Sequence, residues 1–589
     1  MTTQHRRSLL RRSLEGLAFA SSLLSLGAGA VPLDPATIPH FKDPLPKHGG
    51  MPQATKPAGF TGDYYEIAVR QTTQQILPTG FPQTTIWAFG PAANSVNSGF
   101  FTPAAAIVGR PDTPVRVKWI NDLVDHTTGT FITYPPSVPV DQGKHWANPT
   151  GICDGGGPPP DCQGQGSAGP YTGPVPIIVH LHGSHTFSSS DGIPEAWWLP
   201  AGAGTVEPFT RGSDWSQGGN PMEPVPPVVD GAAYFDYPNH QPPTTMFFHD
   251  HTLGITAQNV LMGLAGPYVL AGGPNDLPAG QLPSGLEVYE WPLVIQDRAF
   301  NTDGSFVGVD DGNTFVVNGK VWPYLNVEPR KYRFRIVAAT NSIFLNLSFA
   351  NTGRTGLRFT QIGNDGGFLP KPVVLRSLAL RPGERADVVV DFSAFAGKSV
   401  VLASDGDVMQ FNVVRPLSGP DNTPDPTTLT LIPPTPLCPV VGGVETACET
   451  NTRNVSVLGT ALGTVTGSPP KAVTMLWDAP TTENAPLNST EVWNIYNFGG
   501  DPHPIHLHEV SFEVLGRSAL DGTSPTPPAP GELGRKDTVL SKGYSIVKVR
   551  ANFDIGGLFA WHCHMTSHED DEMMRPMCVV DSAHPCNAH

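Results

Sequence analysis

The stretch "WHCHMTSHEDDEMM", residues 561–574, places a cysteine between two histidines and follows them with a third histidine, four acidic residues and three methionines. Three other short motifs carry paired histidines: "HLHG" from residue 180, "HDH" from residue 249 and "HPIHLH" from residue 503. Ten of the 19 histidines fall in these four motifs. A lone histidine is usually a hydrogen-bonded core or surface residue, but this clustering indicates a metal site.

Strand geometry explains the spacing of the histidine pairs. Side chains at positions i and i+2 of a strand point to the same face, so each H-x-H pair presents two imidazoles to one metal. Four such pairs predict a cluster of eight imidazoles, from His180, His182, His249, His251, His506, His508, His562 and His564.

The same rule separates a second group of ligands. Cys563 lies between His562 and His564, so its side chain points to the opposite face of the strand. His503, three positions before His506, also points away from the cluster, and His568 and Met573 can return from the following turn. Two histidines, a thiolate and a distant thioether form the ligand set of a blue-copper centre.

The two remaining choices at this centre concern the thioether and the metal. Met574 and Met577 compete with Met573 as the axial ligand, and the spacing from His568 favours Met573. Zinc is the rival metal, but a zinc site needs only three or four ligands, far fewer than these motifs provide.

Composition and patterning predict an all-β protein. The 589 residues include 63 glycines and 63 prolines and are only 15% charged, which is typical of short strands joined by many turns. Alternating stretches such as "VRVKW" (115–119), "YRFRIV" (332–337), "ADVVVDF" (386–392) and "IVKVR" (546–550) read as strands.

Proline- and glycine-rich segments divide the chain into three predicted domains. Segments 271–286 and 417–450 separate domains at 31–275, 285–418 and 450–589, and a further rich segment, 136–176, is an insertion in the first. Two histidine pairs lie in the first domain and two in the last. The cluster therefore requires these two domains to meet, with the middle domain, which has no candidate ligand, as a bridge.

The N-terminus, the charge and the cysteines bear on location and partners. In residues 1–30, four arginines precede an apolar stretch and a small-x-small site, which predicts an export signal similar to a twin-arginine signal and a periplasmic or secreted protein; an uncleaved membrane anchor is the alternative. A net charge of −16 disfavours nucleic acid and anionic membranes as partners, and we expect a monomer. Of seven cysteines, we expect pairs Cys153–Cys162, Cys438–Cys448 and Cys578–Cys586, although sequence allows other pairings, which leaves Cys563 free.

The four motifs, in this order, resemble those of the multicopper oxidases. The stretches "HLHGSHTFSSSDGIPEAW" (180–197), "FHDHTLGITAQNVLMGLAGPYVL" (248–270) and "FTQIGNDGGFLPKPVVLRSLALRPGERADVVVDFS" (359–393) are most similar to the branch of bacterial spore-coat laccases, bilirubin oxidase and phenoxazinone synthase. The resemblance implies three cupredoxin-like Greek-key β-sandwich domains and four copper ions. It implies a type 1 copper on His503, Cys563, His568 and axial Met573, a type 2 copper on His180 and His506, and a type 3 pair on His182, His249, His251, His508, His562 and His564.

The same resemblance implies an activity. Family members couple one-electron oxidation of phenols, aromatic amines or tetrapyrroles to the reduction of dioxygen to water, so we expect dioxygen and a small reducing aromatic substrate as partners. Glu569 and Asp191 match carboxylates that assist proton transfer in relatives, whereas Asp570, Asp571 and Glu572 are expected to be solvated loop residues. Each relay candidate has a plainer alternative as a solvated acid or turn former.

Three other functions remain as alternatives. An exported cuprous or metal oxidase is weakened by the presence of only 11 methionines, with no methionine-rich run outside the C-terminus. A copper carrier without turnover has no need of eight paired histidines. A two-domain-type copper nitrite reductase is disfavoured because its catalytic site does not require four H-x-H pairs in one chain.

Overall fold

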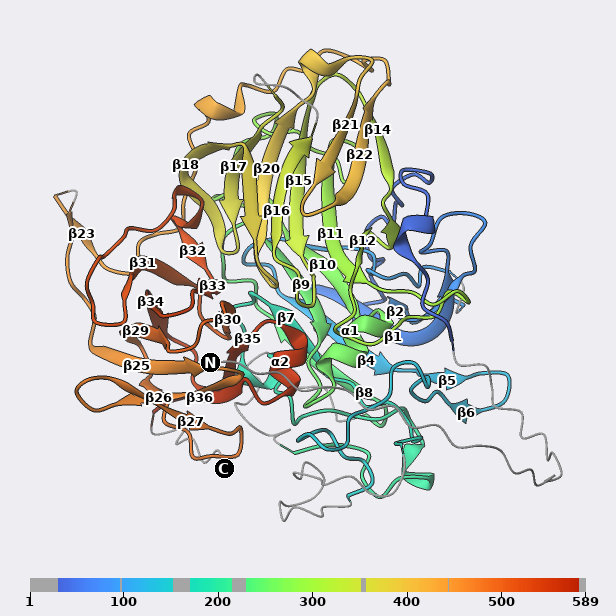
Figure 1. The fold of residues 1–589 in the computed structure, drawn as a ribbon, viewed down its shortest axis with the longest axis horizontal. Coiled ribbons are helices and arrows are strands. Elements are labelled where there is room, and N and C mark those ends of the chain that lie inside the picture. Colours follow the sequence, from blue (N-terminus) through green and yellow to red (C-terminus); the bar gives the residue numbers. More distant parts are fainter. Residues whose placement is uncertain are drawn as a thin grey trace, which may run out of the picture.

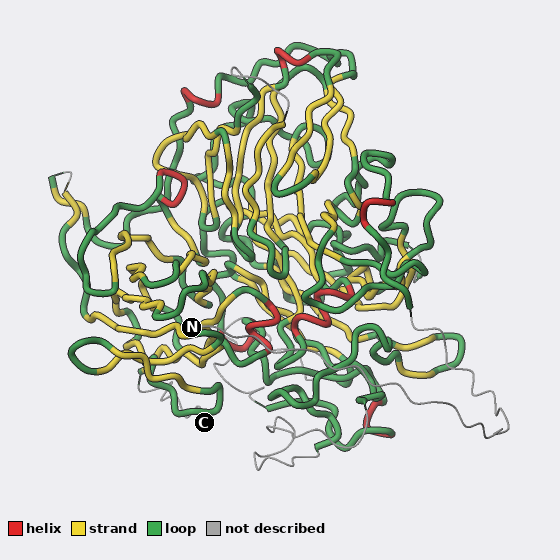
Figure 2. The backbone as a smooth tube through the Cα atoms, viewed as in Figure 1, coloured by secondary structure: helices red, strands yellow, loops and turns green. Residues whose placement is uncertain are grey.

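A computed structural model describes residues 30–95, 98–151, 170–213, 229–350, 356–442 and 444–581 of the chain. Strands dominate these residues, and helices are few and short (Figure 2). The α-helices of the described part are α1 (Thr256–Met262) and α2 (Thr566–Asp570). Single 3-10 turns occur at Pro35–Thr37, Ser188–Ser190, Ala203–Thr205, Ser393–Phe395, Pro426–Thr428 and Pro530–Glu532.

The first two sheets are built from residues 63–270. One sheet has the order β2-β1-β4-β8, with β1 (Asp63–Gln74), β2 (Thr84–Pro91), β4 (Val115–Asn121) and β8 (Ala232–Tyr237). The other has the order β3-β10-β9-β7, with β3 (Ile107–Gly109), β7 (Val179–His182), β9 (Thr245–Asp250) and β10 (Ala265–Leu270). A small hairpin, β5 (Val124–Asp125) and β6 (Thr130–Phe131), lies outside both.

The middle sheets stand at the top of Figure 1 and span residues 290–413. The larger has the order β13-β12-β11-β15-β20-β17-β18, with bounds Lys320–Val321, Thr314–Val317, Glu290–Arg298, Lys331–Ala338, Arg385–Asp391, Phe359–Asn364 and Gly367–Leu375. The smaller has the order β14-β22-β21-β16-β19, with bounds Tyr324–Val327, Asp407–Val413, Ser399–Ala403, Leu345–Ala350 and Ser377–Leu380.

The last two sheets repeat this arrangement between residues 451 and 580. Their orders are β27-β26-β25-β29-β34-β31-β32 and β28-β36-β35-β30-β33. The first has bounds Lys471–Met475, Ala461–Thr466, Asn451–Leu458, Ser489–Asn497, Ser545–Phe553, Phe512–Ala519 and Arg535–Lys536. The second has bounds Asn484–Pro486, Met574–Val580, Gly557–Cys563, His503–Leu507 and Thr538–Ser541.

The prediction of an all-β fold is confirmed, and the four alternating stretches lie in β4, β15, β20 and β34. Mixed parallel and antiparallel pairing within each large sheet excludes a simple meander; β1, for example, pairs antiparallel with β2 and parallel with β4. One continuous apolar core runs through the first four sheets, and the last two enclose a separate core around Trp493 and Trp561. The exact limits of the three domains stay a prediction.

The described residues bear on two of the three predicted disulfides and on the free cysteine. The Cys438–Cys448 disulfide is confirmed in the proline-rich segment that precedes β25, next to the hairpin β23 (Val440–Val441) and β24 (Val444–Glu445). Cys578 is also disulfide-bonded, while Cys153, Cys162 and Cys586 lie outside the described residues. Cys563 is free and buried, as the spacing predicts.

Two findings bear on the location of the protein. In the described part of the chain no helix is long and apolar enough to cross a membrane. The predicted export signal, residues 1–30, lies outside the described residues except for Ala30, so it stays a prediction.

Candidate metal centre

Two strand pairs position the histidine motifs. Strand β7 pairs antiparallel with β9, with His180 opposite His249, and β30 pairs antiparallel with β35, with His506 opposite His562. His251, His508 and His564 each follow directly after the end of β9, β30 and β35. All four strands are buried along their length, so the paired imidazoles point into the region where the first and last sheets meet.

The eight imidazoles form one buried cluster. The Nε2 atom of His562 lies 3.1 Å from Nε2 of His508 and 3.3 Å from Nε2 of His251. On the other side, Nε2 of His506 lies 3.5 Å from Nε2 of His180. The ring nitrogens gather in three sets: His180, His506 and His508; His182, His249 and His564; and His251, His508 and His562.

Half of these rings are held by a backbone carbonyl at the nitrogen that faces away from the cluster. Nδ1 of His180 contacts the carbonyl of Asp191 at 2.5 Å, and Nδ1 of His506 contacts the carbonyl of Asp537 at 2.8 Å. His249 and His562 are held in the same way by the carbonyls of Asp250 and Cys563. Anchoring one ring nitrogen to a fixed acceptor selects the tautomer and aims the other nitrogen at a metal.

Burial favours the uncharged form of seven of the eight histidines. Burial lowers the pKa of His249 to about 4. Burial and the neighbouring histidines together lower the pKa of six further rings well below the ordinary value; these are His180, His182, His251, His506, His508 and His564. Neutral imidazole is the form that binds a metal. Among the described residues, buried His182 Nδ1, His249 Nε2 and both nitrogens of His564 have no hydrogen-bond partner. Partnerless buried nitrogens that converge on one point fit a bound cation.

A second group lies on the other face of β35. The Sγ atom of Cys563 is 3.6 Å from Nδ1 of His503 and 3.9 Å from Nδ1 of His568. Burial raises the pKa of the Cys563 thiol and lowers the pKa of His503 to about 4. A thiol in this environment is neutral unless a metal binds it and takes its proton's place. The predicted turn that returns His568 is the short helix α2.

The register of the C-terminal strand separates the three methionines. Met573 is fully buried beside Cys563, because the Cys563 backbone N–H donates to the Met573 carbonyl at 3.0 Å. Met574 pairs with His562 and packs with Leu253 and Trp477. Met577 pairs with Phe559, four residues along β35 from Cys563. The backbone thus places Met573, rather than Met574 or Met577, beside Cys563.

The acidic residues of the opening stretch lie in different environments. Glu569 is buried, accepts a hydrogen bond from the Thr256 hydroxyl at 2.7 Å and has Oε2 3.1 Å from Nδ1 of His562. The expectation that Asp570 is a solvated loop residue is wrong. Its buried carboxylate accepts from the backbone N–H groups of Thr256 and Ala257, which begin α1, because α2 packs against that helix terminus. Asp571 is exposed and Glu572 is partly buried.

Asp191 links two motifs of the cluster. One carboxylate oxygen lies 2.7 Å from Nδ1 of His508, and the backbone carbonyl holds His180. Burial raises the pKa of Asp191 to about 6, and the nearby His180 and His562 oppose that rise. A carboxyl group with a pKa near neutrality can both accept and release a proton.

Sequence reasoning missed Asp537, which precedes β33. Its Oδ1 lies 3.0 Å from Nε2 of His182, and its carbonyl holds His506. The residue lies 29 positions beyond His508 and 25 before His562, so no motif spacing singles it out. Only the pairing of β33 with β30 brings it to the cluster.

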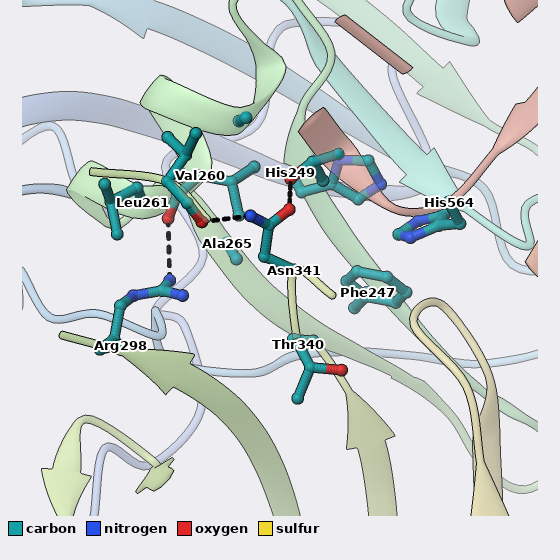
Figure 3. A pocket seen from close by; sticks show the side chains of 13 residues that line it. Phe247, His249, Val260, Leu261, Ala265, Arg298, Thr340, Asn341 and His564 are labelled. Atoms are coloured by element: carbon teal, nitrogen blue, oxygen red, sulfur yellow. Dashed lines mark hydrogen bonds between the residues drawn. The ribbon is translucent and has the colours of Figure 1, made fainter. Parts of the chain in front are cut away.

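A small cavity of about 20 Å³ adjoins the cluster (Figure 3). His249, His564 and Phe247 line one part of it, and Asn341 projects into it from the middle sheets. The Asn341 side chain accepts from the Thr566 hydroxyl and donates to the Val309 carbonyl, which ties the middle sheets to α2. The cavity has room for one water-sized molecule beside two of the histidines.

Three carboxylates act on His568 at the outer edge of the second group. His568 is half-buried, and exposed Asp571, Asp310 and Asp501 are close enough to raise its pKa, although burial lowers the pKa overall. Lys144 forms an ion pair of 2.8 Å with Asp571. The accessible edge of His568 therefore lies in a mainly negative field.

Comparisons with known proteins agree with this geometry. The family model described as multicopper oxidase matches residues 450–583. A laccase from Bacillus subtilis is 34% identical over 92% of this chain and 99% of its own length. A solved multi-copper oxidase from Pediococcus acidilactici superposes with a TM-score of 0.63 at 21% identity, covering 95% of this chain and 97% of that one. A solved Campylobacter jejuni multicopper oxidase, entitled a metallo-oxidase, gives 0.63 at 16% identity, covering 94% and 98%.

Proposed function

The chain belongs to the multicopper oxidase family, and from this premise we propose that it couples one-electron oxidation of small aromatic reductants to the four-electron reduction of dioxygen to water. The proposal rests on the arrangement of side chains at the end of β35. Cys563 points to His503 and His568, while its neighbours His562 and His564 belong to the eight-histidine cluster. One short segment thus joins an electron-accepting centre to a second centre through covalent bonds.

The residues present fit four copper ions. His503, Cys563, His568 and Met573 would hold the type 1 copper, and His180 and His506 the type 2 copper. The grouping of ring nitrogens supports dividing the type 3 pair between two sets, His182, His249 and His564, and His251, His508 and His562. When bound, copper supplies the one-electron redox chemistry that dioxygen reduction requires.

The chain's own groups would perform three tasks. The half-buried His568 offers a reducing substrate a contact edge, while the buried Cys563 stays inaccessible to it. Forming water consumes protons, and Glu569 and Asp191, each beside cluster histidines, are the proposed carriers. The small cavity at His249 and His564 supports access for a diatomic molecule.

Oxygen uptake tests the proposal directly. Copper-loaded protein is given a panel of phenols, aromatic amines, bilirubin and Cu(I), and oxygen consumption is recorded with each. We expect a blue protein that consumes oxygen with at least one aromatic reductant. A protein that binds cupric ion without colour, or whose turnover continues at the same rate without oxygen, contradicts the proposal.

A second candidate, an oxidase of reduced metal ions, is favoured by the carboxylates near His568. A negative field attracts a cation such as Cu(I) and repels anionic reductants. The same panel separates the candidates when it is run on a variant as well. Asp310→Asn should lose Cu(I) oxidation while retaining oxidation of neutral phenols. Uptake with phenols alone, and none with Cu(I), excludes the metal oxidase.

A further inference from the structure

A turn of the middle sheets reaches the histidine cluster although it contributes no histidine. Residues 381–384 connect β19 to β20, and Figure 1 shows β20 standing over β9 and β33. Gly383 lies in this turn with φ of +84°, and a Cβ placed on it would be 2.8 Å from Cγ of His564 and 3.1 Å from Cε1 of His182. The middle part of the chain therefore packs directly against two of the eight rings.

Arg385, two residues later, joins this turn to both neighbouring parts of the chain. Its Nη1 donates to Asp537 Oδ1 at 2.7 Å and its Nη2 donates to Asp537 Oδ2. Its Nε donates to the carbonyl of Thr245 in β9 at 3.0 Å. The side chain is fully buried. A planar guanidinium holds a carboxylate at two points and so fixes its orientation as well as its position.

Asp537 transmits this position to the cluster. Its Oδ1 lies 3.0 Å from Nε2 of His182, and buried His182 Nδ1 is left without a partner in the described structure. His180, His249, His506 and His562 are instead fixed through Nδ1. His182 is thus held from the opposite nitrogen, by the Asp537 carboxylate together with the Thr538 hydroxyl at 3.1 Å, and these contacts direct its other nitrogen toward His249 and His564.

We propose that Arg385 is a positioning residue for the histidine cluster: by clamping Asp537 it fixes the ring of His182, so the middle domain helps to build a metal site to which it supplies no ligand. This inference rests on the proposed function, because it takes the cluster histidines to be copper ligands. It adds a role for a residue outside the four histidine motifs, since the side-chain hydrogen bonds of Arg385 in the described structure go to Asp537 and to backbone carbonyls.

The chain provides a matched control. Arg333 in β15 is similarly buried and grips Asp387 with Nε at 2.9 Å and Nη2 at 2.5 Å. Among the described residues, Asp387 contacts no cluster histidine. Replacing Arg333 thus breaks a comparable buried pair in the same sheet without touching His182.

The test measures copper retention and spectra in Arg385→Lys, Arg385→Ala and Arg333→Lys. All are loaded with copper and dialysed against a chelator, and copper per chain, visible absorption and the electron paramagnetic resonance of the cluster coppers are recorded. We expect Arg385→Lys to keep its blue absorption, which reports a folded last domain, but to bind cluster copper about 10- to 100-fold more weakly. Arg333→Lys should match the parent protein in every measurement.

Chemical rescue separates positioning from general destabilisation. Arg385 also lines a cavity of about 310 Å³, through which a small cation can reach the space left in Arg385→Ala. Millimolar guanidinium should restore cluster copper in this variant and have no effect on the parent. If neither Arg385 variant is soluble, Asp537→Asn takes their place, with the same expected loss of cluster copper and retained blue absorption.

Two results would overturn the inference, and they differ from failure of the proposed function. Arg385→Lys and Arg385→Ala that retain all cluster copper would show that the clamp is not needed. Equal losses in Arg333→Lys would show that the effect is general to the sheet. If the parent protein itself binds no copper at the cluster, it is the proposed function that fails.

Discussion

The Cys563 centre and the eight-histidine cluster lie on opposite faces of one strand but are built in different ways. All candidate ligands of the Cys563 centre come from residues 503–573, within one sheet and the helix that follows it. The cluster needs β7 and β9 from the beginning of the chain, β30 and β35 from its end, and the turn before β20 from its middle. The first centre therefore requires one folded domain, whereas the second requires three docked domains.

The largest effect is expected from removing the Cys563 thiol, which adjoins both centres. We expect Cys563→Ser to abolish the blue colour and turnover, because the hydroxyl of serine is a hard, weak ligand for copper at this centre. The cluster histidines keep their positions, so cluster copper should remain. Visible absorption, paramagnetic resonance and oxygen uptake check the three statements. A blue Cys563→Ser protein would remove Cys563 from the copper site.

A substitution at Glu569 should affect the cluster side alone. Glu569→Gln keeps the hydrogen bond with Thr256 but removes the carboxyl group that can take up and release a proton beside His562, so turnover should fall by about 10²- to 10⁴-fold, as expected for a lost proton carrier. The blue absorption should be retained. The measurement is oxygen uptake across a pH series.

Asp405→Asn, an exposed acid in the turn between β21 and β22, is the control for Glu569→Gln and should retain the parent pH profile. Unchanged turnover and pH dependence in Glu569→Gln would exclude Glu569 as a proton relay.

Sequence accounts for one centre more completely than for the other, and the reason is physical. Alternation along a strand is a local rule, so it assigned Cys563 and His562 to opposite faces, and the register of β35 agrees. Hydrogen-bond partners such as Asp537 and Arg385 come from distant segments whose approach depends on domain docking, and no local pattern encodes it. The burial of Asp570 also has no local signal. The helix terminus that buries it begins 314 residues earlier in the chain. Sequence spacing thus predicts which side chains share a face but not what packs behind them.

The Cys563 centre can be tuned without disturbing the cluster. Met573→Leu removes the thioether beside Cys563 but keeps a similar apolar volume in the buried site. We expect the blue colour to persist and the reduction potential of the centre to rise, because the axial ligand sets that potential. Turnover should change only several-fold. Redox titration of the visible band is the measurement, and Met577→Leu, in β36 opposite Phe559, is the control. An unaltered potential in Met573→Leu would count against Met573 as the axial ligand.

The smallest effect is expected where neither centre is involved. Asp421, beyond the middle sheets, accepts hydrogen bonds from the Thr423 hydroxyl at 2.6 Å and from the Lys331 N–H at 3.0 Å. Burial raises the pKa of Asp421, but these hydrogen bonds outweigh it and lower the pKa from 3.8 to about 2. The carboxylate therefore stabilises the fold above about pH 4, and this stabilisation is lost as the pH falls towards 2.

Asp421→Asn should accordingly cost about 1 kcal/mol at neutral pH, an amount reduced for solvent screening because the group is only partly buried. Thermal unfolding of variant and parent should differ by about 2 °C at pH 7 and converge in acid as Asp421 becomes protonated. Both copper spectra should be unchanged, because the hydrogen bonds of Asp421 involve residues of neither centre. A loss of cluster copper in Asp421→Asn would mean that the middle domain positions the cluster through its overall stability rather than through the turn that carries Gly383 and Arg385.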